Sequence, residues 1–242
     1  HESMDRLASV NVARVSGPGS GFEELLRESV RVHGHLCPGQ VLGVRMSLLG
    51  LREVGVSDPK GKQRKDLIVF VEMDRCATDA VQSVTGCSLG KRTLKFLDYG
   101  KMAATFLNLQ SGRAARIVAR EDARQKAEQR VPAVADKYRA QLEAYRIMAD
   151  RELFDVVDVR VQLGPEDLPG RPLSRVPCSV CGEYVQDHRE VRRNGQVWCR
   201  SCRDGGYFRP KDSFSTAVMH FGHNGLEIRS KVWIEVDGDP VF

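Results

Sequence analysis

The stretch HGHLCPG, residues 33–39, places two imidazoles and a thiol within five residues, between two predicted helices. Residues 20–32, which precede this stretch, are predicted to form a helix, because their apolar side chains have helical spacing and acidic residues lie in the first turn. Gly34 permits backbone angles that end this helix, and Pro38 biases Cys37 away from the helical region before the next helix begins. Because imidazole and thiolate groups are ligands of soft and borderline metal ions, the stretch predicts a metal site at this junction.

A short buried strand is predicted at residues 66–73, which are largely apolar and rich in β-branched side chains. Cys76 stands just past its end, before a short predicted helix. Pro132 divides a long, charged helical stretch over residues 121–150. Further strands are expected at residues 93–97, 102–107, 114–118 and 153–163. The pattern predicts an α+β core over residues 4–165, with a mixed or antiparallel sheet and packed helices.

Three residues, His35, Cys37 and Cys76, are candidate ligands of one core metal, with His33 as a fourth ligand or as an orienting neighbour. Zn²⁺ is the expected ion. On an extended backbone His33, His35 and Cys37 would point to one side, since alternate residues share a face. Cys76 would reach the same place from the end of the buried strand. Asp79, three residues later, is the candidate for proton transfer or for supporting a ligand. In the alternative reading, the histidines face solvent and Cys76 packs as a small apolar side chain.

An independent four-cysteine pattern near the other end predicts a structural zinc site. Two CxxC pairs are separated by seventeen residues and consist of Cys178, Cys181, Cys199 and Cys202. Asn194-Gly195 between them is a hairpin signal that would bring the second pair back beside the first. Such closed thiolate sites usually hold structural Zn²⁺, with an iron site as the minor alternative. We therefore expect a linker over residues 166–177, a zinc ribbon over 178–211 and a strand-rich extension of unknown placement over 212–242.

The composition, 41% hydrophobic and 29% charged in 242 residues, is that of an ordinary globular protein. The sequence contains no run of eighteen apolar residues, so no membrane-spanning helix is expected. Four of the seven cysteines have the spacing of zinc ligands, which favours a reducing, cytoplasmic location. The formal net charge of +5 lies entirely in residues 171–211, which hold nine Lys/Arg and four Asp/Glu. Few aromatic residues accompany these charges, so a nucleic-acid partner is not expected.

Two long motifs resemble the E-subunit family of formylmethanofuran dehydrogenase: HGHLCPGQVLGVRM at residues 33–46 and VEMDRCATDAVQSVTGCSLGKRTLKFLDYGKMAATF at 71–106. The resemblance spans about residues 20–165, with Ser88 where the family often has threonine. It implies an α+β core that pairs as an intertwined homodimer and has a metal-binding pocket. The resemblance implies that this pocket is lined by His33, His35, Cys37, Cys76 and Asp79, with Thr85 and Cys87 nearby as candidate cofactor-binding residues.

Three functions remain open from the sequence. The leading hypothesis, implied by the family name, is a cytoplasmic metal-binding accessory protein in molybdenum- or tungsten-dependent one-carbon metabolism, with such an enzyme as its partner. The alternative is a stand-alone enzyme in which Zn²⁺-activated water loses a proton to Asp79, or in which Cys37 or Cys76 is a thiolate nucleophile. A third possibility is a regulatory or interaction module led by the ribbon. No membrane partner is expected.

Overall fold

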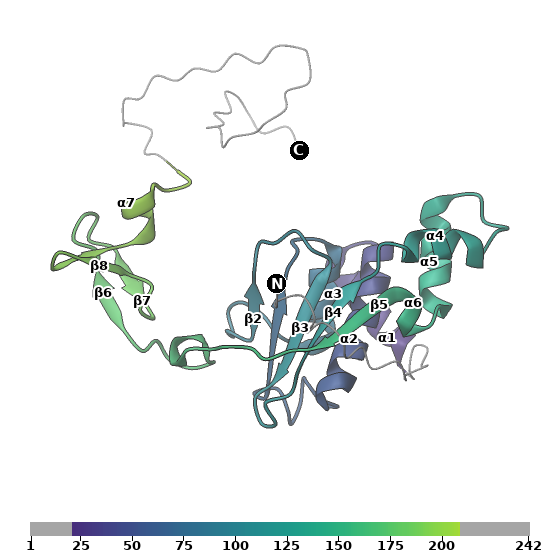
Figure 1. Ribbon diagram of the computed structural model, residues 1–242, viewed down its shortest axis with the longest axis horizontal. Helices are drawn as coiled ribbons and strands as arrows, with labels where there is room; N and C mark the ends of the chain where they lie inside the picture. Colours follow the sequence, from purple (N-terminus) through teal and green to yellow (C-terminus); the bar gives the residue numbers. More distant parts are fainter. Residues whose placement is uncertain (1–20, 209–242) are drawn as a thin grey trace, which may run out of the picture. The chain divides into compact units, whose positions relative to one another are not determined.

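The computed structural model describes residues 21–208, and the chain divides between Arg171 and Pro172 into two compact units (Figure 1). Ser20, the first residue of the expected helix over 20–32, and the expected extension over residues 212–242 lie outside the described residues. Within residues 21–208, no helix combines the length and the apolar character needed to cross a membrane.

The first unit is built on a mixed five-stranded sheet with the order β2-β1-β3-β4-β5 (Figure 1). β1 pairs in parallel with β2 and antiparallel with β3, and the remaining neighbours are antiparallel. A helix, α3, connects the parallel pair, because parallel neighbours need a crossover connection. The strands are β1 (Leu67–Val71), β2 (Leu94–Phe96), β3 (Ala103–Asn108), β4 (Ala114–Ala119) and β5 (Phe154–Asp158). The predicted α+β class with a mixed sheet is confirmed.

Three helices carry the candidate core site: α1 (Phe22–His33), α2 (Pro38–Val54) and α3 (Cys76–Thr85). α2 packs against β3 and β4, and both α1 and α3 pack against α2. Gly43 allows the closest approach: a Cβ atom there would lie 2.6 Å from the Cβ of Ala80 and 2.7 Å from the carbonyl oxygen of Ala77. The backbones of α2 and α3 are therefore almost in contact, which fixes the position of each helix start relative to the other.

The charged stretch over residues 121–150, for which the sequence allows two helices or one kinked helix, forms separate helices on either side of Pro132. They are α4 (Ala123–Arg130), α5 (Lys137–Ile147) and the short α6 (Asp150–Leu153). Arg45 of α2, which is almost fully buried, donates to the carbonyl oxygens of Tyr145 and Met148 and to the Asp150 carboxylate at 2.7 Å. This guanidinium thus ties α2 to the α5–α6 turn and satisfies carbonyl groups that the helix end leaves free.

The second unit consists of two small hairpins and one short helix. β6 (Arg175–Pro177) pairs with β7 (Tyr184–Gln186), β8 (Val191–Arg193) pairs with β9 (Gln196–Trp198), and α7 (Arg200–Asp204) follows. Asn194 and Gly195 have φ angles of 52° and 74°, the left-handed pair that a tight hairpin turn requires. β6 begins inside the stretch that we assigned to the linker, and α7 was not predicted.

Candidate metal centres

The core site forms at the junction of α1 and α2. His33 is the last residue of α1, Gly34 at φ 98° turns the chain, and Cys37 is the extended residue that precedes α2. The donor atoms of His33, His35 and Cys37 lie within 4.8 Å of one another. The expected extended run was wrong at His33, which is still helical. The left-handed turn at Gly34 brings the two imidazole rings to a centroid distance of 4.6 Å instead.

Asp79, on α3, orients the first of these histidines. Its Oδ2 lies 2.7 Å from Nδ1 of His33, and Nε2 of the same ring faces the Cys37 sulfur at 4.0 Å. A proton held on Nδ1 by the carboxylate leaves a lone pair on Nε2, which is the state in which a histidine binds metal. His35 is exposed, whereas Cys37 is only 5% exposed. The site is therefore closed on the cysteine side and open to solvent at His35.

Cys76 is the first residue of α3 and packs against Gly39, near Cys37. A Cβ atom on Gly39 would be 3.7 Å from both sulfurs, which places them within reach of the same point. They are thus closer together than the roughly 8 Å beyond which two sulfurs could not share one ion. Burial raises the pKa of the Cys37 thiol, and the neighbouring Cys76 thiol raises it further, although the backbone N–H of Gln40 opposes this.

Two polar residues that sequence reasoning missed support this arrangement. Gln40 of α2, fully buried, donates from its amide to the carbonyl oxygen of Cys76 at 2.5 Å and accepts from the hydroxyl of Ser29 in α1. One side chain therefore links all three helices beside the site. The sequence did contain a signal for this role, because Gln40 is a polar residue that interrupts the apolar face of α2 one turn after Cys37. Tyr138 of α5 is the second residue, and its hydroxyl donates to the carbonyl oxygen of Leu36 at 3.2 Å.

The structure does not bring Thr85 and Cys87 to this site. Thr85 is the last residue of α3, about 13 Å along the helix from Cys76, and Cys87 follows it by two residues. Thr85 donates to the carbonyl oxygen of Val81 and accepts from the N–H of Cys87. The Cys87 thiol is 4% exposed, contacts the Leu67 carbonyl, and has a pKa that burial raises. Both residues belong to the packing at the end of the helix.

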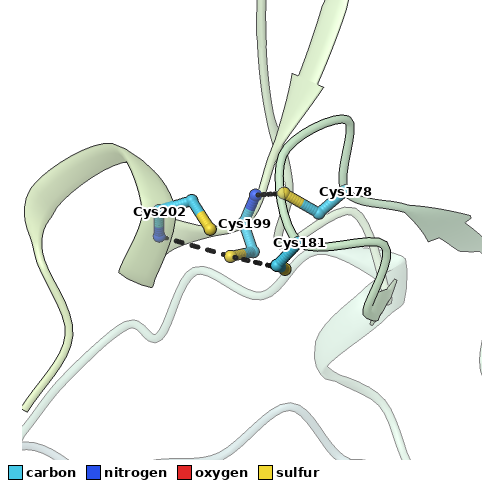
Figure 2. Close-up of side chains that lie close together, drawn as sticks. All are labelled: Cys178, Cys181, Cys199 and Cys202. Carbon is cyan, nitrogen blue, oxygen red and sulfur yellow. Dashed lines mark hydrogen bonds between the residues drawn. The ribbon is translucent and has the colours of Figure 1, made fainter. Parts of the chain in front are cut away.

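The four cysteines of the second unit converge on one point, with all sulfurs within 4.8 Å of one another (Figure 2). The CxxC turns position them through backbone groups, because the N–H of Cys199 donates to the Cys178 sulfur and the N–H of Cys202 donates to the Cys199 sulfur, both at 3.3 Å. Backbone N–H groups lower the pKa of Cys178 to about 6, and the sulfur of Cys199 raises the pKa of Cys202 to about 12. The cluster fits a zinc ribbon, in which a cation offsets the crowded thiolates.

Known sequences match the part of the chain that holds the core site. The family profile described as FmdE, molybdenum formylmethanofuran dehydrogenase operon, matches residues 32–155, just over half of the chain. A probable S-adenosyl-L-methionine-binding protein of Archaeoglobus fulgidus is 38% identical over 103 residues, which cover 42% of this chain. The matched part makes up only 28% of that protein, so the chain spans little more than a quarter of this relative's length.

A solved structure has a similar fold. It is the crystal structure of an FmdE-like protein of Syntrophus aciditrophicus, named for tungsten formylmethanofuran dehydrogenase, with a TM-score of 0.52 and 21% identity. The alignment covers 78% of this chain and 95% of that protein. At this level of identity the likeness concerns the fold, and the sequence motifs carry the assignment. On the match over residues 32–155, the chain belongs to the FmdE family.

Proposed function

We propose that this chain is a metal-binding protein with a working site in its core and a structural zinc ion in its ribbon. The observation that carries the proposal is the convergence of His33, His35 and Cys37, whose donor atoms lie within 4.8 Å of one another. The Cys76 sulfur is not part of that group, but it lies beside the Cys37 sulfur at Gly39 and is the candidate fourth ligand. A mixed set of imidazole and thiolate donors suits Zn²⁺ or another borderline cation.

The residues around the core site would hold it ready for an ion. Asp79 keeps the His33 ring in the tautomer that exposes Nε2, and Gln40 fixes the start of α3 against α2. The exposed His35 leaves an approach for an exogenous ligand with sulfur or oxygen donors. A metal bound here would act as a Lewis acid or as a template for such a ligand. The ligand set alone therefore supports either handling of a ligand or catalysis.

The wider role that we propose is that of a cytoplasmic accessory protein in molybdenum- or tungsten-dependent one-carbon metabolism. The support is the FmdE description of the family, which names a molybdenum enzyme operon, and the name of the Syntrophus protein, which refers to a tungsten enzyme. A molybdenum or tungsten enzyme is then the expected partner, and a homodimer the expected assembly. Sedimentation that gives only the 27.0 kDa single chain at micromolar concentration would exclude a stable dimer.

Metal analysis after anaerobic purification tests the site directly. The wild type should contain one ion in each of its two centres, and Cys37→Ala should lose the core ion while keeping the ribbon ion. Cys87→Ala is the matched control, since it removes a cysteine that is as buried as Cys37 but lies at the other end of α3. Equal metal content in the wild type and in Cys37→Ala would refute the core site. Affinity for molybdate or tungstate would favour ligand handling.

The same geometry supports a second candidate, a thiol-dependent enzyme. Cys37, His33 and Asp79 form a chain of nucleophile, base and orienting carboxylate, with separations of 4.0 Å and 2.7 Å. The raised pKa of Cys37 counts against this candidate, because a protonated thiol is a poor nucleophile. The metal site and the thiol-dependent enzyme can be distinguished by the rate at which iodoacetamide alkylates the metal-free protein at pH 7, measured by peptide mass spectrometry. If Cys37 reacts fast in the wild type and more slowly in Asp79→Asn, the result favours the enzyme. If Cys37 reacts slowly in the wild type, the result favours the metal site.

A further inference from the structure

A second candidate site lies in the first unit, at the opposite end of α3 from the core metal centre. It is a cavity of ≈ 920 Å³ beside Ser83 and Gly86. Its other walls come from the loop before β1, from Lys91 and Thr93 after α3, and from Leu168, Pro169 and Gly170. Cavities that hold small molecules have volumes of about 300–1,000 Å³, so this one has the size of a ligand site.

The charged residues of the lining are mostly basic. The lining contains one acidic residue, Glu28, which already binds Lys60 at 3.0 Å. It contains four basic residues: Lys60, Arg64, Lys65 and Lys91. Arg64 and Lys91 donate to the backbone carbonyls of Gly61 and Gly86, contacts that leave their charge uncompensated. The cavity therefore has an excess of positive charge, which attracts anions and increases their local concentration.

A buried hydroxyl provides an independent sign of a missing partner. Ser83 Oγ is buried and has no hydrogen-bond partner among the described residues. Other helical hydroxyls in the same unit are satisfied: Ser47 donates to the carbonyl of Gly43 at 2.7 Å, and Thr85 donates to that of Val81 at 2.6 Å. A buried polar atom without a partner is unfavourable and needs an explanation. A ligand with oxygen acceptors in the cavity would supply that partner.

Four apolar side chains also line the cavity. Pro59, Leu109, Leu168 and Pro169 present hydrocarbon surface to the same space as the basic side chains. We propose that this cavity binds a small molecule that carries a phosphate group on an apolar body. The phosphate suits the basic side better than a single carboxylate does, because its two charges and three terminal oxygens can engage several lysines and the Ser83 hydroxyl together. The proposal does not depend on the metal content of either centre.

Calorimetric titration of the full, metal-loaded chain with phenyl phosphate tests the proposal, with benzoate as the comparison ligand. We expect saturable binding of phenyl phosphate in the millimolar range or tighter, weakened by added salt, and weaker binding of benzoate. Lys65→Ala should reduce the affinity about tenfold, as expected for a charge-assisted hydrogen bond. Lys62→Ala is the matched control: it removes an exposed lysine from the same loop that does not line the cavity, and its effect should stay below about twofold.

Ser83→Ala separates a ligand contact from a structural role. It should lower the affinity for phenyl phosphate several-fold, while the melting temperature of the ligand-free protein stays the same or rises, because an unpaired buried hydroxyl has been removed. The proposal is overturned if phenyl phosphate does not bind saturably, or if benzoate binds equally well. Equal losses in the two lysine variants would also overturn it, since they would mean that only the diffuse charge of the loop attracts the probe.

Discussion

The two candidate metal centres use similar ligands, but different parts of the fold bring those ligands together. All four ribbon cysteines come from 25 consecutive residues, 178–202, whose strands are three residues long. In the described part of that unit, the residues buried as a whole are Cys178, Cys199 and Asp187. The candidate core ligands instead come from the ends of three helices that pack around a buried glutamine. The comparison indicates that packing can hold candidate ligands together in advance, whereas we expect a module with so little core to depend on the ion itself.

The largest expected effect is on the ribbon. Cys199→Ser removes one of four thiolates, and we expect residues 173–208 to unfold while the first unit stays folded, because the ion would supply most of the stability of so small a module. Limited proteolysis of the variant, read by mass spectrometry, should show rapid cleavage within that segment alone. Wild-type resistance of the segment would mean that its hairpins are stable without the ion and would remove the contrast between the two centres.

A smaller effect is expected in the core. Asp79→Asn should lower the metal affinity of the core centre by about 10- to 100-fold, the usual cost of losing a carboxylate behind a metal-binding histidine. Competition with a chromophoric chelator measures this change. The thermal unfolding of the first unit should change little, because the Asp79 side chain is 44% exposed. A large loss of stability with unchanged metal affinity would assign this residue to packing.

The smallest expected effect is at the rim of the core centre. Tyr138→Phe removes the hydrogen bond from the phenol to the Leu36 carbonyl, a contact that contributes about 1 kcal/mol or less when half exposed. We expect a decrease of that size in the free energy of unfolding and less than about a threefold decrease in core metal affinity. If the affinity falls as far as in Asp79→Asn, the loop between α1 and α2 is held mainly by α5, and the site is less preformed than the helix packing indicates.

Much of this fold follows from local patterns in the sequence. The apolar strand at 67–71, the break at Pro132 and the hairpin at Asn194-Gly195 depend on nearby residues, so spacing and turn chemistry were sufficient to predict them. The tie from Arg45 to the α5–α6 turn was not predictable in this way. It joins residues about a hundred positions apart, and nothing in the local sequence of α2 indicates that an arginine points into the core.

The candidate core site was predictable in its membership but not in its geometry. Histidine and cysteine so close together indicated metal chemistry, and Asp79 was a natural supporting residue because it follows Cys76 by one helical turn. The spacing could not distinguish an extended run from a helix end at His33, since Gly34 is compatible with both. Thr85 was placed near the site by family resemblance, and the length of α3 separates it from the ligands.

The close contact between α2 and α3 at Gly43 has a thermodynamic consequence. Because the two helix starts are already fixed, an ion that enters the core centre orders few residues and buries little additional apolar surface. The heat capacity change of metal binding there should therefore be small. Binding in the ribbon is coupled to folding and should have a clearly negative heat capacity change. The temperature dependence of the two binding enthalpies would thus distinguish metal binding to a preformed site from metal binding that is coupled to folding.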